Sequence, residues 1–249
     1  MDGYFILGLI IAMLLFVYLR SYANGNPFRV LTAVLCIDRD ADLAPKLYEA
    51  IRFNTTGPIL IVTRERDKET RDFWQNKAIL ELVPDYEIQK RHNFIKIAEK
   101  RSLALKYAKE NGFDAVWFVD SDVIPTEGVL KQLCNTNKDV CVAQPRVRWA
   151  GKAVVGIEDS EPPFIKMHEI GLLDLSVERR PCIIAGFACT LVKSSAFDQK
   201  IEYFKLSKGD FYVEGEDIGF FMNCYKSGLK CEYLTRWDPP HLYDRLVKA

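Results

Sequence analysis

Residues 115–125 read AVWFVDSDVIP, an apolar run that leads directly into two carboxylates. The run Ala115–Val119 is rich in β-branched and aromatic residues, which predicts a strand buried on both faces of a parallel sheet. Asp120 and Asp122 follow at once. In an extended chain, residues i and i+2 point to the same side. The sequence therefore predicts two convergent carboxylates at the carboxyl edge of a sheet, where α/β proteins bind ligands.

Two adjacent carboxylates imply a cation, because like charges repel unless something positive lies between them. Mg²⁺ and Mn²⁺ are commonly held by one or two carboxylates together with a diphosphate. We predict a metal site formed by Asp120 and Asp122. His241 is the candidate third ligand, since neutral imidazole binds Mn²⁺ well, and the alternative for this lone histidine is an ordinary surface or core residue. The alternative is a turn whose aspartates cap the next helix, because Asp is a common turn residue.

The rest of the chain alternates between strand and helix patterns. Strands are predicted at 29–37, 58–63 and 183–192, and helices at 42–53, 68–82 and 93–110, with long loops over 150–181. This alternation predicts an α/β fold with a mostly parallel central sheet flanked by helices. Gly186 interrupts the last predicted strand, either where a donor ligand approaches the backbone closely or where the chain simply packs tightly.

Arg101 lies within the apolar stripe of the helix predicted at 93–110. A cation in that position needs a partner, so we expect its guanidinium to reach an anion at the sheet edge. A structural ion pair with a core carboxylate and a donor-binding role remain equally open.

Two further carboxylates open the helix that follows Gly215. A carboxylate at a helix start is often only a partner for the helix dipole, and this describes Glu216 well. Asp217 is expected to face inward with Phe220 and Phe221, where desolvation would raise its pKa and suit it to proton abstraction. The predicted catalytic residues are therefore Asp217 and its neighbour Glu216.

The amino terminus differs from the remainder of the chain. Residues 3–19 carry no charge, which predicts a single membrane-spanning helix within residues 1–20, followed by a linker at 21–28 and a catalytic domain at 29–249. A cleaved signal peptide or a buried core helix are the alternatives. Arg20 and Arg29 follow the span, so the positive-inside rule favours a cytosolic catalytic domain.

The composition narrows the class of function. Lys and Arg together number 34, as do Asp and Glu, so the chain lacks the basic excess of a nucleic-acid binder. The seven cysteines form no CxxC pair, and most lie in apolar runs, which indicates buried reduced thiols.

Taken together, these motifs resemble the GT-A fold of glycosyltransferases, most closely the inverting family-2 type. The resemblance spans residues 29–241 and rests on the Asp-x-Asp motif and on the Glu-Asp pair at the helix start. Lys100-Arg101-Ser102 stands where the family has an A-R-N-like motif, without the asparagine. The resemblance implies these roles: donor binding by Asp38, Arg64, Arg101, Asp120 and Gly186; metal binding by Asp120, Asp122 and His241; general base catalysis by Asp217.

The implied reaction moves a sugar from a nucleotide-sugar donor to a hydroxyl of a glycan, protein or lipid acceptor, with Mn²⁺ or Mg²⁺ and with inversion. A retaining transferase of the same fold is the nearest alternative. A nucleotidyltransferase would be expected to carry a Gly-rich, basic loop after its first strand, where this chain has the acidic run 37–42. A non-catalytic sugar-binding protein is disfavoured because the expected carboxylates are present.

Overall fold

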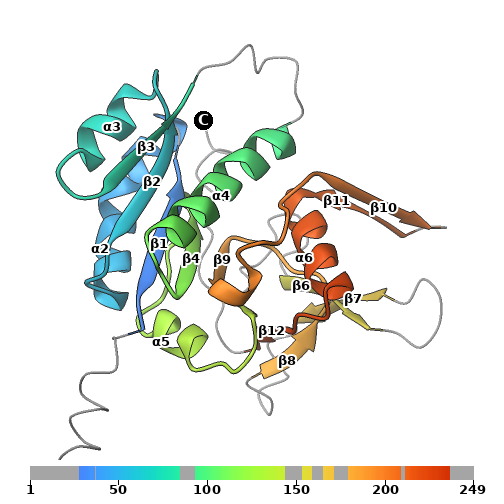
Figure 1. The fold of residues 1–249 in the computed structure, drawn as a ribbon. Coiled ribbons are helices and arrows are strands. Elements are labelled where there is room, and N and C mark those ends of the chain that lie inside the picture. The colour runs from blue at the N-terminus through green and yellow to red at the C-terminus, as the bar shows by residue number, and fades with distance from the viewer. Residues whose placement is uncertain are drawn as a thin grey trace, which may run out of the picture.

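An eight-stranded sheet forms the centre of the molecule (Figure 1). The computed structural model describes residues 28–36, 38–84, 93–143, 153–158, 165–170, 179–208 and 211–235. The strands of the large sheet are β1 Val30–Leu35, β2 Ile59–Arg64, β3 Ile79–Val83, β4 Ala115–Asp120, β5 Val140–Val142, β8 Arg179–Cys182, β9 Cys189–Lys193 and β12 Cys231–Leu234.

The order across this sheet is β3-β2-β1-β4-β9-β5-β12-β8. The first four strands are mutually parallel, and β9 pairs antiparallel with both β4 and β5. β12 pairs parallel with β5 and antiparallel with β8. The fold is thus mixed α/β with a mostly parallel central sheet, as the sequence predicted.

Helices cover both faces of the sheet (Figure 1). They are α2 Ala44–Asn54, α3 Lys68–Trp74, α4 Asn93–Glu110, α5 Val129–Cys134 and α6 Glu216–Lys226, with 3₁₀ helices at η1 Asp38–Leu43 and η3 Ser194–Ala196. α4 and α6 bury apolar side chains against one face, and α2, α3 and α5 bury theirs against the other. Strand side chains alternate between the two faces. In β1, for example, Ala33 packs in the α4–α6 core and Val34 in the opposite one.

Two small antiparallel hairpins accompany the large sheet. β10 Phe204–Lys208 pairs with β11 Phe211–Gly215, and β11 leads directly into α6. β6 Ala153–Glu158 pairs with β7 Ile165–Ile170, and Gly156 forms an isolated bridge with Ile184. The hairpin β10–β11 extends away from the large sheet on the α6 side (Figure 1).

Three predicted elements differ from those observed. The helix predicted at 68–82 ends at Trp74, and Ile79–Val83 instead pairs with β2 as an edge strand. The predicted loops at 150–181 contain the β6–β7 hairpin and the start of β8. The strand predicted at 183–192 begins only at Cys189, so Gly186 lies in the irregular segment before it.

No helix in the described part of the chain is long and apolar enough to cross a membrane. This finding corrects the predicted membrane localisation. The predicted anchor within residues 1–20 falls outside the described residues.

Candidate active site

The carboxyl ends of β1, β2 and β4 meet along one edge of the sheet. The register places Leu35 of β1 beside Asp120 of β4 on one side and beside Val62 of β2 on the other. The loops that leave these strands therefore start side by side, which is where parallel α/β sheets bind ligands.

Arg101 of α4 connects two of the predicted carboxylates. Its Nη2 donates to Asp120 Oδ1 at 2.9 Å, and its Nε lies 3.3 Å from Glu216 Oε1. Arg101 is only 4% exposed, and its Cζ lies over the Phe187 ring, 4.6 Å from the ring centroid. The expected contact between Arg101 and an anion at the sheet edge is confirmed. Through Arg101, helix α4 connects the carboxyl end of β4 with the start of α6.

Both carboxylates at the start of α6 are withdrawn from solvent, and Glu216 is more buried than the sequence suggested. Glu216 is buried at 5% exposure and paired with Arg101, whereas Asp217 is half-buried. Burial raises the pKa of Glu216, and the positive charge of Arg101 opposes this rise. Glu216 is therefore more than a partner for the helix dipole, because it is buried and pairs with Arg101 of α4.

Asp217 nevertheless has the pKa expected of a general base. Desolvation and then the neighbouring Glu216 carboxylate raise its pKa to about 7, against the lowering effects of the Ile218 amide and Arg101. The Ile218 amide donates to Asp217 Oδ1 at 2.8 Å. A Cβ atom on Gly215 would lie 2.3 Å from that oxygen, so glycine at this position leaves room for the carboxylate.

The chain turns directly after β4. The Val123 amide donates to the Asp120 carbonyl at 3.0 Å, and Ser121 and Asp122 form the turn. The extended-chain argument that placed Asp120 and Asp122 on one side therefore does not apply beyond Asp120. Ser121 Oγ donates to Asp40 Oδ2 at 2.7 Å, which links this turn to η1.

The predicted nucleoside residues Asp38 and Arg64 are brought together by a carboxylate that the sequence reading missed. Asp67 accepts from Arg64 Nε at 2.7 Å and from the Asp38 amide at 3.4 Å. Burial alone would raise the pKa of Asp67, but the hydrogen bonds from Arg64 hold it below its usual value. The sequence did contain a signal for Asp67. An aspartate three residues after an arginine at the end of a strand can accept hydrogen bonds from that arginine and so stabilise a turn.

The remaining predicted residues contribute less to this arrangement. The Gly186 carbonyl accepts from Thr190 Oγ1 at 2.8 Å, next to the Phe187 ring beneath Arg101. His241 lies outside the described residues. Within the described ranges, no three His, Cys, Asp or Glu side chains are grouped so that they could hold a metal ion. All seven cysteines are free, in agreement with the predicted thiols.

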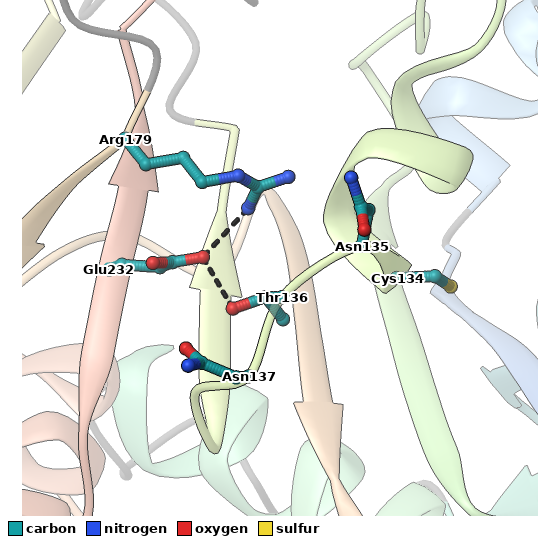
Figure 2. A pocket seen from close by; sticks show the side chains of 6 residues that line it. All are labelled: Cys134, Asn135, Thr136, Asn137, Arg179 and Glu232. Carbon is teal, nitrogen blue, oxygen red and sulfur yellow. Dashed lines mark hydrogen bonds and ion pairs between the residues drawn. The ribbon is translucent and has the colours of Figure 1, made fainter.

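A cavity of about 340 Å³ lies beside β5, β8 and β12, between these strands and the end of α5. It is lined by Cys134, Asn135, Thr136, Asn137, Arg179 and Glu232. Figure 2 shows Arg179 and Thr136 converging on the Glu232 carboxylate, with Arg179 Nη1 2.7 Å from Glu232 Oε1. None of the predicted site residues lines this cavity.

Comparison with known proteins adds information on the fold. No protein-family model matches the chain, and no curated protein matches it. Among solved structures, a protein described as mycobacterial aligns with a TM-score of 0.52 and 14% identity, over 88% of this chain and 69% of that one. At this identity the similarity shows the fold alone.

Two weaker structural matches are described as transferases. One is a nucleotidyl transferase from Methanothermobacter thermautotroptrophicus, with a TM-score of 0.48 and 11% identity over 90% of this chain and 96% of that one. The other is assigned as a nucleotide-diphospho-sugar transferase from Desulfovibrio desulfuricans G20, with a TM-score of 0.44 and 10% identity over 85% and 82% of the two chains.

Proposed function

We propose that this protein is a metal-dependent glycosyltransferase of the GT-A type, which moves a sugar from a nucleotide-sugar donor to an acceptor hydroxyl with inversion. The observation that carries the proposal is the position of Arg101 between Asp120 and Glu216. This ion-pair bridge places the Asp-x-Asp segment and the Glu-Asp helix start at one edge of the sheet. Nucleoside diphosphate binding and proton abstraction would then take place at adjacent positions.

In this proposal Asp217 is the general base. It takes the proton from the acceptor hydroxyl while that oxygen bonds to the anomeric carbon of the donor. The bond from that carbon to the β-phosphate oxygen breaks, and a nucleoside diphosphate leaves with the bonding electrons. A base with a pKa of about 7 suits this step, because proton transfer is most effective when the pKa lies near the working pH.

Arg101 supports the reaction through its charge and through the two carboxylates that it positions. The guanidinium of Arg101 is held in place by its burial and by its ion pairs with Asp120 and Glu216, beneath the carboxyl edge of the sheet. A fixed cation there favours the negative charge that develops on the leaving diphosphate, because charges interact strongly where water is excluded.

The carboxylates at the end of β4 fit a divalent cation. The Asp120 side chain is 30% exposed, and its ion pair with Arg101 is made through Oδ1, while the half-buried Asp122 follows in the turn. Mg²⁺ and Mn²⁺ need only one or two carboxylates when phosphates supply further ligands. When bound, the ion would supply positive charge for the departing diphosphate.

The deciding experiment incubates the purified protein with a panel of nucleotide sugars, Mn²⁺ or Mg²⁺, and simple glycoside acceptors. Release of nucleoside diphosphate with a product of inverted anomeric configuration supports the proposal, and retained configuration indicates the retaining alternative. Release of pyrophosphate from a nucleoside triphosphate and a sugar phosphate would instead indicate a nucleotidyltransferase. Donor binding without turnover of any acceptor or water would indicate a binding protein.

A further inference from the structure

We propose that Asp67 is the positioning residue for the nucleoside end of the donor site, a role that rests on the proposed function. Asp67 lies in the turn between β2 and α3 and is 1% exposed, so it does not itself reach a ligand. It acts through the two loops that it joins, those that leave β1 and β2.

The contacts of Asp67 define this role. Its Oδ2 accepts from Arg64 Nε at 2.7 Å, from the Arg64 amide at 3.1 Å and from Thr63 Oγ1 at 3.2 Å. Its Oδ1 accepts from Arg64 Nη2 and, at 3.4 Å, from the Asp38 amide. Asp38 in turn accepts from the Thr70 amide at 3.0 Å through its Oδ1. The Asp67 carboxylate therefore ties the end of β2 to the start of η1, and the Asp38 carboxylate extends these contacts to the first turn of α3.

The consequence for Arg64 is a fixed orientation. A free arginine side chain loses rotamer freedom when a ligand immobilises it, and that loss weakens binding. The bidentate contact with Asp67 fixes the guanidinium plane of Arg64 before any ligand binds. The Arg64 side chain is 24% exposed. A planar guanidinium held in this way can stack on a base or donate to its carbonyl oxygens.

The place of this cluster in the sheet assigns it to the nucleoside rather than to the diphosphate. β2 is separated from β4 by β1, so Arg64 lies two strand spacings from the Asp120 strand, roughly 10 Å at about 4.8 Å per strand. The diphosphate belongs beside Asp120 and Asp122 in the proposed reaction. The nucleoside is the part of the donor that extends away from the reacting carbon, toward β2.

The test compares Asp67→Asn with a matched control, Asp139→Asn. Asp139 also accepts hydrogen bonds from a backbone amide and a hydroxyl, those of Lys230 and Ser195, but at the amino-terminal side of the sheet. Binding of nucleoside diphosphates and of inorganic pyrophosphate with Mn²⁺ is measured by titration calorimetry, together with KM, kcat and the urea midpoint. We expect Asp67→Asn to raise the nucleoside diphosphate Kd about tenfold, the effect of losing one charge-assisted contact. The Kd of pyrophosphate and kcat at saturating donor should change less than about twofold, well below that tenfold step.

A second variant keeps the test decisive if Asp67→Asn does not fold. Arg64→Lys retains the charge and removes the fork that Asp67 holds, so it should raise the same Kd and leave pyrophosphate binding unchanged. The double variant should bind no more weakly than either single one. An unchanged Kd in folded variants, or equal weakening of pyrophosphate binding, would overturn the positioning role. A wild-type protein that binds no nucleoside diphosphate would overturn the proposed function itself, and with it this inference.

Discussion

Arg101 lies between Asp120 and Glu216, with its Nη2 2.9 Å from one carboxylate and its Nε 3.3 Å from the other. This contact joins α4, the end of β4 and the start of α6 at a buried point. The same side chain therefore contributes to the stability of the domain and to the geometry of the candidate site. These two contributions can be separated by experiment.

Replacement of Arg101 by Gln should destabilise the protein, because it leaves Glu216 buried without its cation. Breaking a buried pair by removing one partner costs about 3–5 kcal/mol. The loss should be larger at pH 8 than at pH 5. Burial already raises the pKa of Glu216, and without Arg101 this carboxyl can take up a proton as the pH falls, after which it needs no cation. Urea unfolding at both pH values measures the effect.

Lys106→Gln is the control for that measurement. Lys106 and Glu110 form a surface pair on the same helix, with 3.8 Å between charged atoms and side chains 69% and 61% exposed. Its removal should change the unfolding free energy by no more than about 0.5 kcal/mol. If Arg101→Gln were equally mild at pH 8, the bridge would not stabilise the fold.

Gly219→Ala should destabilise the packing of α6. A Cβ atom at this position would lie 1.9 Å from the Glu202 carbonyl oxygen, which is backbone and cannot swing away. Overpacking of this kind costs about 1–3 kcal/mol. Gly228→Asn, beyond the same helix, should be mild, because open space surrounds it and Asn tolerates its φ of +75°. Thermal unfolding of both variants checks the expected difference.

Asp122→Ala should abolish sugar transfer while the domain stays folded, and excess chelator should do the same to the wild-type protein. The reason is that Asp122 would hold the divalent ion beside the diphosphate. Asp42→Ala, which removes an exposed carboxylate of η1, should leave turnover unchanged. Titration of Mn²⁺ in the presence of a nucleoside diphosphate should show weaker binding in Asp122→Ala alone. Full activity in chelator would rule out metal dependence.

The sequence predicted the features that depend on local periodicity. The bounds of α4, Asn93–Glu110, follow from a capping asparagine at its start and from Asn111-Gly112 after its end. The strand Ala115–Val119 follows from an apolar run, and the pairing of Arg101 from a cation in an apolar stripe. Such patterns report the burial of one element, so they locate buried strands and helix faces well.

Features that depend on neighbouring elements could not be predicted in this way. The segment Ile79–Val83 continued a helical pattern in sequence, yet its pairing with β2 makes it a strand. The burial of Glu216 depends on where α4 places Arg101, and no spacing within α6 contains that information. Asp67 joins two loops that only the sheet order brings together.

Asp217→Asn should reduce turnover by about 10²–10⁴-fold with little change in donor affinity, because general-base catalysis contributes a factor of that size. The variant keeps the size of the side chain and removes the proton acceptor. A transferase whose base lies elsewhere would tolerate this change.

The pH profile tests the same assignment more sharply. Only ionised Asp217 can accept the acceptor's proton, so kcat of the wild-type protein should rise with pH through about 7 and then level off. Glu216→Gln removes the neighbouring anion that helps to raise the pKa of Asp217, so the rising limb should move to lower pH while turnover at pH 8 persists. Asp217→Asn should show no such limb. An unshifted limb in Glu216→Gln, or the same limb in Asp217→Asn, would assign the titration to another group.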